Sequence, residues 1–178
     1  MSPASSPEGF PPSLVVTVDT SVLIAFKGLV KIDDQWGLLM RMSDLVSAGA
    51  ITFPRQVVKE LAYGQYPDAP GAWIGNAKRE VCHLQPREET LVKVLEVAPN
   101  LVDYEATADR EVADPYVAAM AHEVETRHNG CRVVVATNDV VDRLPLKLSL
   151  RTACERLGVE VWSAEDLIAW VKDGTEPG

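Results

Sequence analysis

The chain has 178 residues, of which 47% are hydrophobic and 24% are charged, and its formal net charge is −9. This length allows one domain with a proper core, and the composition is that of a folded globular protein rather than a disordered or membrane protein. The negative charge argues against a surface that binds nucleic acid through bulk positive potential. It does not exclude a local site, because carboxylates gathered around one metal ion add to the count without forming a repulsive face.

The ends of the chain differ from its middle in composition. Residues 1–13 are rich in Pro and Ser and predict a flexible leader, residues 14–172 a single domain, and residues 173–178 a short frayed tail. No apolar run reaches the roughly 18 residues of a membrane helix. The leader also lacks the pattern of a signal peptide, so we expect a cytoplasmic protein without membrane association.

Short apolar and β-branched runs alternate with longer helical patterns along the chain. Buried strands are expected at residues 14–18, 50–53, 81–84, 132–137 and 159–162. Helices are expected at residues 20–27, 36–48, 55–63, 71–80, 88–97, 112–128, 148–157 and 164–172. This alternation predicts an α/β fold, a three-layer α/β/α domain around a mostly parallel sheet of about five strands.

Two aspartates come shortly after expected strands, at the sheet edge where such folds bind ligands. Asp19 follows the run LVVTV, and Asp139 follows RVVVAT. If the two strands are neighbours, both carboxylates project from one edge, and their like charges repel or raise one pKa. A divalent cation removes that conflict, because Mg²⁺ and Mn²⁺ prefer hard oxygen ligands. The pattern therefore favours a metal site at this edge.

Glu60 and Asp114 are two further acids whose positions fit such a site. Glu60 lies beside the buried stripe of the helical run PRQVVKEL, and Asp114 opens the run DPYVAAMA. Each acid has an ordinary alternative when taken alone. Glu60 then becomes a solvated helix residue, Asp114 an N-cap before proline, and Asp139 a turn residue. The joint order of the four acids is what favours a site.

This order of acids resembles that of the PIN-domain nucleases, a family that includes the VapC-type toxins of toxin–antitoxin systems. The matching stretches are VDTSVLIAF, PRQVVKEL, ADPYVAAMA, VVVATND and LGVEVWSAEDLI, which cover nearly the whole expected domain. The resemblance implies a PIN-like domain that hydrolyses RNA with one or two Mg²⁺ or Mn²⁺ ions. Asp19, Asp114 and Asp139 are then expected to bind the metal directly, with Glu60 holding a metal-bound water. An antitoxin protein is the implied partner.

The resemblance also assigns supporting roles to neighbouring side chains. Thr20, Ser21 and Thr137 match positions where a hydroxyl orients a carboxylate or a metal-bound water. Capping of the first helix is the simpler role for Thr20 and Ser21. Asp142 is a candidate fifth acid, for which a solvated turn position is an equal alternative. Residues 63–80 extend the middle of the chain beyond a minimal toxin and are expected to form a flap or a contact surface.

Basic residues near the acids are expected to guide RNA toward the pocket, although a solvated surface role is the alternative for each one alone. The four that we assign to RNA binding are Arg55, Lys59, Arg143 and Lys147. Together they predict a modest positive rim and weak, salt-sensitive binding of RNA. The apolar residues of the helix at 36–48 are compatible with a homodimer, but the sequence fixes no interface.

A metal-dependent ribonuclease, acting as the toxin of a toxin–antitoxin pair, is the leading hypothesis. The second is a PIN-like module that has lost catalysis and acts through protein or RNA contacts, which the acidity and the long middle segment favour. A phosphatase or phospho-acceptor domain with Asp19 as nucleophile fits less well. Ser21 stands where such a phosphatase would have a second aspartate.

Overall fold

A computed structural model of the chain describes residues 12–62, 68–81, 85–102, 112–127 and 130–178. Helices and strands alternate along it, as the sequence predicts. The elements are β1 (Leu14–Val18), α1 (Thr20–Leu29), α2 (Ile32–Ser47), β2 (Ile51–Thr52), α3 (Arg55–Ala62), α4 (Ala69–Val81), α5 (Glu88–Val97), the 3-10 turn η1 (Pro99–Leu101), α6 (Asp114–Arg127), β3 (Arg132–Ala136), α7 (Leu150–Leu157), β4 (Glu160–Trp162) and α8 (Ala164–Asp173).

The described strands form one sheet in the order β2-β1-β3-β4, and every pair of neighbours is parallel. β1 pairs with β3 along its whole length, from Leu14 opposite Arg132 to Val18 opposite Ala136. Both strands consist mainly of buried β-branched residues, which suits a sheet covered on two faces. The prediction that the strands before Asp19 and Asp139 are neighbours is confirmed.

The sheet has four strands within the described ranges rather than the five that the sequence predicts. The expected strand at 81–84 is the one that differs. Val81 is the last residue of α4, and residues 82–84 lie outside the described part of the chain. A short apolar run is compatible with a helix end as well as with a strand, and here the helix includes Val81.

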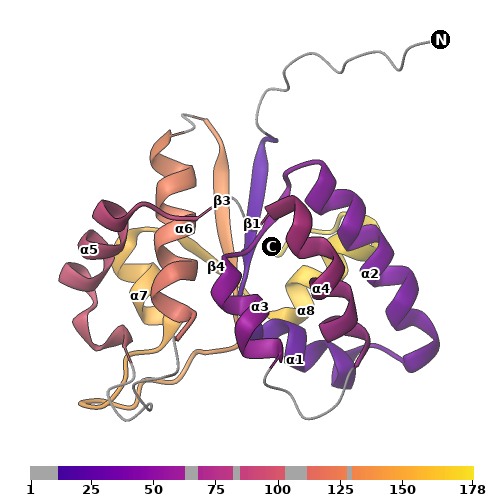
Figure 1. Cartoon of the computed structure of the whole chain (residues 1–178), viewed down its shortest axis with the longest axis horizontal. Helices are drawn as coiled ribbons and strands as arrows, with labels where there is room; N and C mark the ends of the chain where they lie inside the picture. Colours follow the sequence, from indigo (N-terminus) through magenta and orange to yellow (C-terminus); the bar gives the residue numbers. More distant parts are fainter. Residues whose placement is uncertain (1–11, 63–67, 82–84, 103–111, 128–129) are drawn as a thin grey trace.

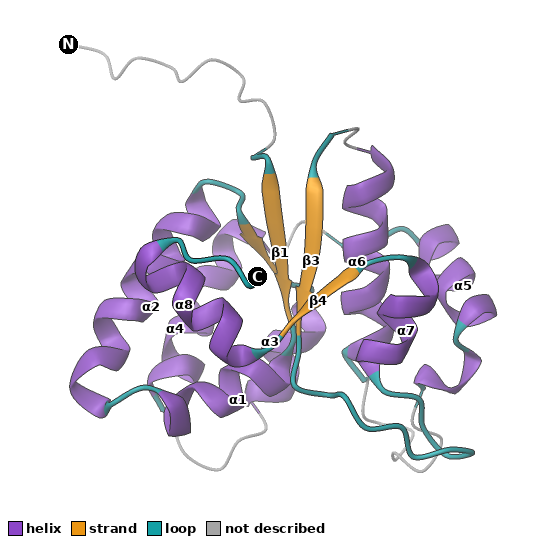
Figure 2. Cartoon of the chain, turned by 180° about the vertical axis from the view of Figure 1, so that it is seen from behind, coloured by secondary structure: helices purple, strands orange, loops and turns teal. Residues whose placement is uncertain are grey.

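Helices lie on both sides of the sheet (Figure 1; Figure 2 from behind). α6 packs on β1 and β3 with α5 and α7 beside it, whereas α8 packs on β3 and β4 together with α1 and α2. Apolar side chains fill both interfaces, among them Val16, Phe26, Val134 and Trp162. This layering is consistent with the expected α/β/α architecture. None of the described helices is long and apolar enough to cross a membrane.

Parallel pairing places the carboxyl ends of all four strands at one edge of the sheet, in the lower centre of Figure 1. β1 leads there directly into α1, and the chain leaves β3 at the same edge before it reaches α7. α6 begins near this edge and runs back along the sheet (Figure 1). The fold therefore brings the end of β1, the loop after β3 and the start of α6 close together.

Candidate active site

Asp19 is the buried N-cap residue of α1 at the carboxyl end of β1. Its Oδ2 accepts hydrogen bonds from the hydroxyl of Ser21 at 2.6 Å and from the hydroxyl of Thr137 at 2.9 Å. The backbone N–H of Ser21 also donates to this oxygen, at 3.4 Å. The prediction that Thr20 or Ser21 caps α1 is thus wrong, because Asp19 occupies the N-cap position.

The same two hydroxyls attach the loop after β3 to the end of β1. Ser21 Oγ accepts from the backbone N–H of Asn138 at 2.9 Å, and Thr137 Oγ1 accepts from the backbone N–H of Asp139 at 3.0 Å. Ser21 and Thr137 therefore contact both the carboxylate of Asp19 and the segment that carries Asp139. The hydroxyl of Thr20, by contrast, is buried with no hydrogen-bond partner among the described residues.

Asp114 and Asp139 face each other across the ammonium group of Lys147. Lys147 Nζ lies 2.6 Å from Oδ2 of Asp114 and 3.1 Å from Oδ2 of Asp139. The backbone N–H of Leu150 also donates to that oxygen of Asp139, at 3.0 Å. Oδ2 of Asp114 is buried, and the ammonium of Lys147 is the partner that the described residues provide for it. One cation is thus shared between two acids.

Glu60 approaches the cluster from α3, where its side chain is half-buried. Its Oε1 accepts a hydrogen bond from the backbone N–H of Ala113 at 2.8 Å, at the residue before α6 begins. Its charge also acts on Asp19. All four predicted acids therefore belong to one neighbourhood.

Gln56, one helical turn before Glu60, is a buried residue that sequence reasoning missed, and its amide has no hydrogen-bond partner in the described ranges.

Burial disturbs the protonation of the two most enclosed acids. Removal from water raises the pKa of Asp19, although the hydrogen bonds from Ser21 and Thr137 oppose the rise and the negative charge of Glu60 adds to it. Burial likewise raises the pKa of Asp114 to about 8, and repulsion by Asp19 acts in the same direction. Both acids therefore keep a proton to a higher pH than an exposed aspartate does.

Lys147 is the residue whose place differs most from expectation. The sequence predicts it in an RNA-binding rim, but its side chain is only 13% exposed and lies among the acids. Burial disfavours its charge, yet the attraction of Asp114 and Asp139 outweighs burial and raises the pKa of Lys147. The sequence offers no signal for this position, because a lysine in a polar loop usually lies in solvent.

Two loop contacts fix the backbone around Lys147. Its N–H and C=O exchange hydrogen bonds with Arg143, at 3.0 and 2.8 Å, and the next residue, Leu148, is buried and donates to the carbonyl of Asn100 at 2.7 Å. Asp142 lies outside the acid cluster. The carboxylate of Asp142 accepts a hydrogen bond from the backbone N–H of Ser149 at 2.9 Å, and this bond lowers the pKa of Asp142.

The chemistry of this donor set fits a hard divalent cation. Asp19, Asp114 and Asp139 supply carboxylate oxygens from three elements, and the buried Oδ2 of Asp114 already has a cation, the Lys147 ammonium, 2.6 Å away. The three residues are those that could hold Mg²⁺ or Mn²⁺. No three Asp, Glu, His or Cys side chains within the described ranges already stand as a metal-holding group. The cation that lies between Asp114 and Asp139 is instead Lys147.

Three of the four residues assigned to RNA binding point outward. Arg55 and Lys59 are exposed on α3, the helix of Glu60, and Arg143 is exposed on the loop that leads to Lys147. A hollow of about 690 Å³ adjoins the acid cluster at Thr137 and runs toward β4. None of the four acids lines this hollow, so it lies beside the acid cluster rather than over it.

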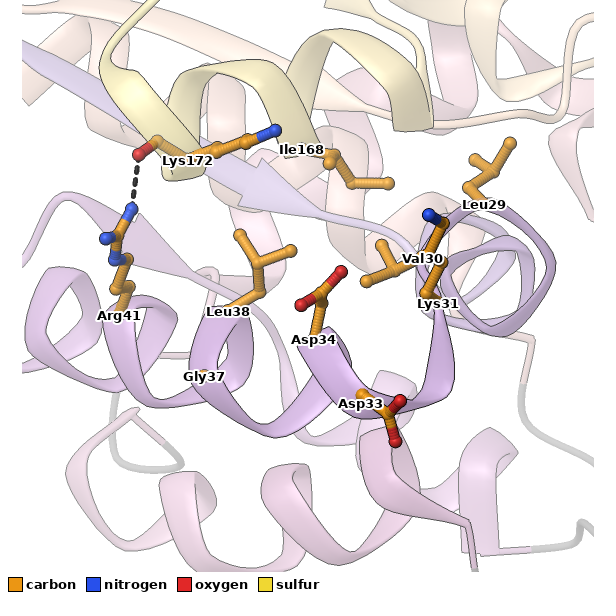
Figure 3. A pocket seen from close by; sticks show the side chains of 10 residues that line it. All are labelled: Leu29, Val30, Lys31, Asp33, Asp34, Gly37, Leu38, Arg41, Ile168 and Lys172. Atoms are coloured by element: carbon orange, nitrogen blue, oxygen red, sulfur yellow. Dashed lines mark hydrogen bonds between the residues drawn. The ribbon is translucent and has the colours of Figure 1, made fainter.

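A second groove, of about 610 Å³, lies away from the acids between α2, the end of α1 and α8 (Figure 3). Leu38 and Ile168 line it, and Arg41 at one end donates a hydrogen bond to the backbone carbonyl of Lys172. None of the residues that the sequence assigns to the site lines this groove. This groove is therefore separate from the acid cluster at the sheet edge.

Comparison with known proteins identifies one family. The chain matches the family described as "Domain of unknown function (DUF4411)" over residues 16–172. No curated protein matches it. The matched region runs from β1 to α8 and contains all four acids together with Lys147.

Proposed function

Because the chain belongs to the DUF4411 family, whose description gives no function, we propose its activity from the site: a PIN-like, metal-dependent ribonuclease that hydrolyses RNA phosphodiester bonds. One observation carries the proposal. Asp19, Asp114 and Asp139 converge at one edge of a parallel sheet, where the Lys147 ammonium offsets only part of their charge. Clusters of perturbed carboxylates at such edges are typical of functional sites rather than of structural ones.

Each residue has a specific part in the proposed reaction. Asp19, Asp114 and Asp139 would hold the ion, and the hydroxyls of Ser21 and Thr137 would fix the orientation of Asp19 through the contacts at 2.6 and 2.9 Å. When bound, Mg²⁺ or Mn²⁺ would activate water for in-line attack on the phosphodiester and stabilise charge on the leaving oxygen. Glu60 would orient water at the edge of the cluster and anchor the start of α6 through Ala113.

The substrate and partners follow from the surface around the site. The exposed Arg55, Lys59 and Arg143 would contact RNA phosphates, so binding should weaken as salt is raised. Ile32, Trp36 and Met40 recur every four residues on the exposed side of α2 and support a contact with an antitoxin or a second copy. A toxin acting on cytoplasmic RNA is the role that we propose.

Cleavage of single-stranded RNA in Mn²⁺ tests the proposal. Loss of a residue that only supports a metal ligand typically costs about 10- to 100-fold, so loss of a direct ligand in Asp19→Asn or Asp139→Asn should reduce cleavage by more than that. Asp142→Asn is the matched control, because Asp142 lies in the same loop but faces Ser149. Equal activity in the parent and both site variants would remove the proposed ribonuclease.

A binding module without catalysis is the alternative, favoured by the absence of a ready-made metal group among the described side chains and by the neutralising contact of Lys147. Such a module would hold RNA or a protein partner without cutting RNA. Binding assays and cleavage assays on the same RNA separate the two functions. Tight binding that leaves the RNA intact in Mg²⁺, Mn²⁺ and EDTA alike would support the module.

A further inference from the structure

Lys147 occupies the position that a metal ion would take between two of the proposed ligands. Its Nζ lies within 3.1 Å of Oδ2 of both Asp114 and Asp139, and these side chains are only 9% and 21% exposed. An ammonium group and a divalent cation both bind carboxylates, since each is stabilised by negatively charged oxygen atoms close by. Both cannot occupy this space at the same time.

The backbone around Lys147 is held by contacts that do not involve its ammonium group. The backbone of Lys147 is held by Arg143, and its neighbour Leu148 is buried against the carbonyl of Asn100. The side chain, however, is a flexible four-carbon stem with its charge at the tip. Rotation about that stem moves the ammonium away from Asp114 and Asp139 without breaking these backbone contacts.

We infer that Lys147 is a built-in counter-ion that fills the site in the absence of metal, and that a bound Mg²⁺ or Mn²⁺ ion displaces it from Asp114 and Asp139. This inference rests on the proposed metal site. It accounts for an ammonium group that lies between two acids whose chemistry suits a divalent cation. It also gives Lys147 a role within the acid cluster, which differs from the role in an RNA-binding rim that the sequence predicts.

Competition between the two cations has a measurable consequence for metal affinity. The apparent dissociation constant of a site is the intrinsic constant divided by the fraction of time for which the site is free, so a lysine present nine-tenths of the time weakens binding about tenfold. Removing the ammonium should therefore tighten metal binding. The displaced lysine should also become accessible to solvent once the ion is bound.

Calorimetric titration of Mn²⁺ into the metal-free protein tests the first consequence. Lys147→Met keeps the length of the side chain without its charge and should bind Mn²⁺ about tenfold more tightly than the parent. Arg143→Met is the matched control, because it removes a positive charge from the same loop at a side chain that is exposed. Unchanged or weaker binding in Lys147→Met, or an equal gain in Arg143→Met, would overturn the inference.

Chemical labelling of the parent tests the second consequence and requires no variant to fold. Acetylation by an amine-reactive reagent, mapped by mass spectrometry, should be slow at Lys147 without metal and several-fold faster in saturating Mg²⁺. Lys93, exposed on α5, serves as an internal control whose rate should not change. Continued protection of Lys147 in saturating Mg²⁺ would contradict displacement.

These readouts separate the inference from the proposed activity. Both measure metal binding without RNA, so tighter binding in Lys147→Met and metal-induced labelling would support the counter-ion even if no RNA were cut. Cleavage of RNA in Mn²⁺ with Lys147 still protected would instead support the ribonuclease and overturn the counter-ion.

Discussion

Helix α6 carries two buried acids with opposite surroundings. Glu123 accepts hydrogen bonds from the backbone N–H of Arg87 and the hydroxyl of Thr90, each at 3.0 Å, and the guanidinium groups of Arg87 and Arg127 lie within 4 Å of the same oxygen. Asp114, at the other end of the helix, shares one lysine with Asp139 and is repelled by Asp19.

The difference separates a structural acid from a functional one. Glu123 has two basic partners of its own and ties α5 to α6, which is how a buried carboxylate is made compatible with folding. Asp114 lies in a group where acids outnumber bases, an arrangement that stability alone does not favour. A charge left unbalanced at a sheet edge is the feature that points to a ligand.

The largest expected effect concerns activity at Asp114. In Asp114→Asn, RNA cleavage in Mn²⁺ should fall by more than about 100-fold, because a proposed direct ligand is lost. Folding should be preserved, since Asn resembles the protonated carboxyl group that burial favours at Asp114. Initial cleavage rates, with unfolding curves on the same samples, provide the measurement. If a folded Asp114→Asn protein retained full cleavage, Asp114 would be as dispensable for activity as Glu123. The distinction between a functional and a structural acid on α6 would then be wrong.

The second effect concerns stability at Glu123. Glu123→Gln replaces an acceptor that faces two N–H or O–H donors and two guanidinium groups, so the free energy of unfolding should fall by about 1–3 kcal/mol. Denaturation by urea measures this loss. RNA cleavage below the unfolding transition should equal that of the parent. A variant as stable as the parent but inactive would assign Glu123 to the site instead.

The smallest effect is a pH dependence of stability in the metal-free protein. The pKa of Asp114 is raised from its ordinary 3.8 to about 8, so between these values the folded chain holds a proton that the unfolded chain releases. The free energy of unfolding should therefore decrease as pH rises toward 8. Urea denaturation in EDTA at several pH values should show a shallower decrease for Asp114→Asn. A parent whose stability rises over this range would contradict the assigned shift.

Local sequence patterns predict much of the architecture. The run LVVTV predicts β1 with its observed bounds, and the apolar strand before Asp139 is indeed the neighbour of β1. Adjacent parallel strands then bring Asp19 and Asp139 to one edge, which no detail of packing could alter. Where the pattern is short and ambiguous, the structure differs: α4 includes Val81, the first residue of the expected strand, and residues 82–84 lie outside the described part of the chain.

Contacts between residues that are far apart in the chain could not be predicted from the sequence. Glu123 looks like a solvated helix residue until α5 brings Arg87 and Thr90 against it. The position of Lys147 likewise depends on how the loop folds back through Arg143 and Leu148 toward α6. The sequence is equally compatible with Asp142 in the site and with Asp142 in a solvated turn. Its contact with Ser149 decided between these two interpretations. Periodicity reports which face is buried, but not which charges meet there.

Anomalous diffraction from crystals grown with Mn²⁺ tests the central claim most directly, because the ion's position is seen without reference to activity. We predict one or two anomalous peaks within coordination distance of Asp19, Asp114 and Asp139, with the ammonium group of Lys147 moved away from them. Crystals saturated with Mn²⁺ that show no peak among these carboxylates, with Lys147 still between Asp114 and Asp139, would contradict the account.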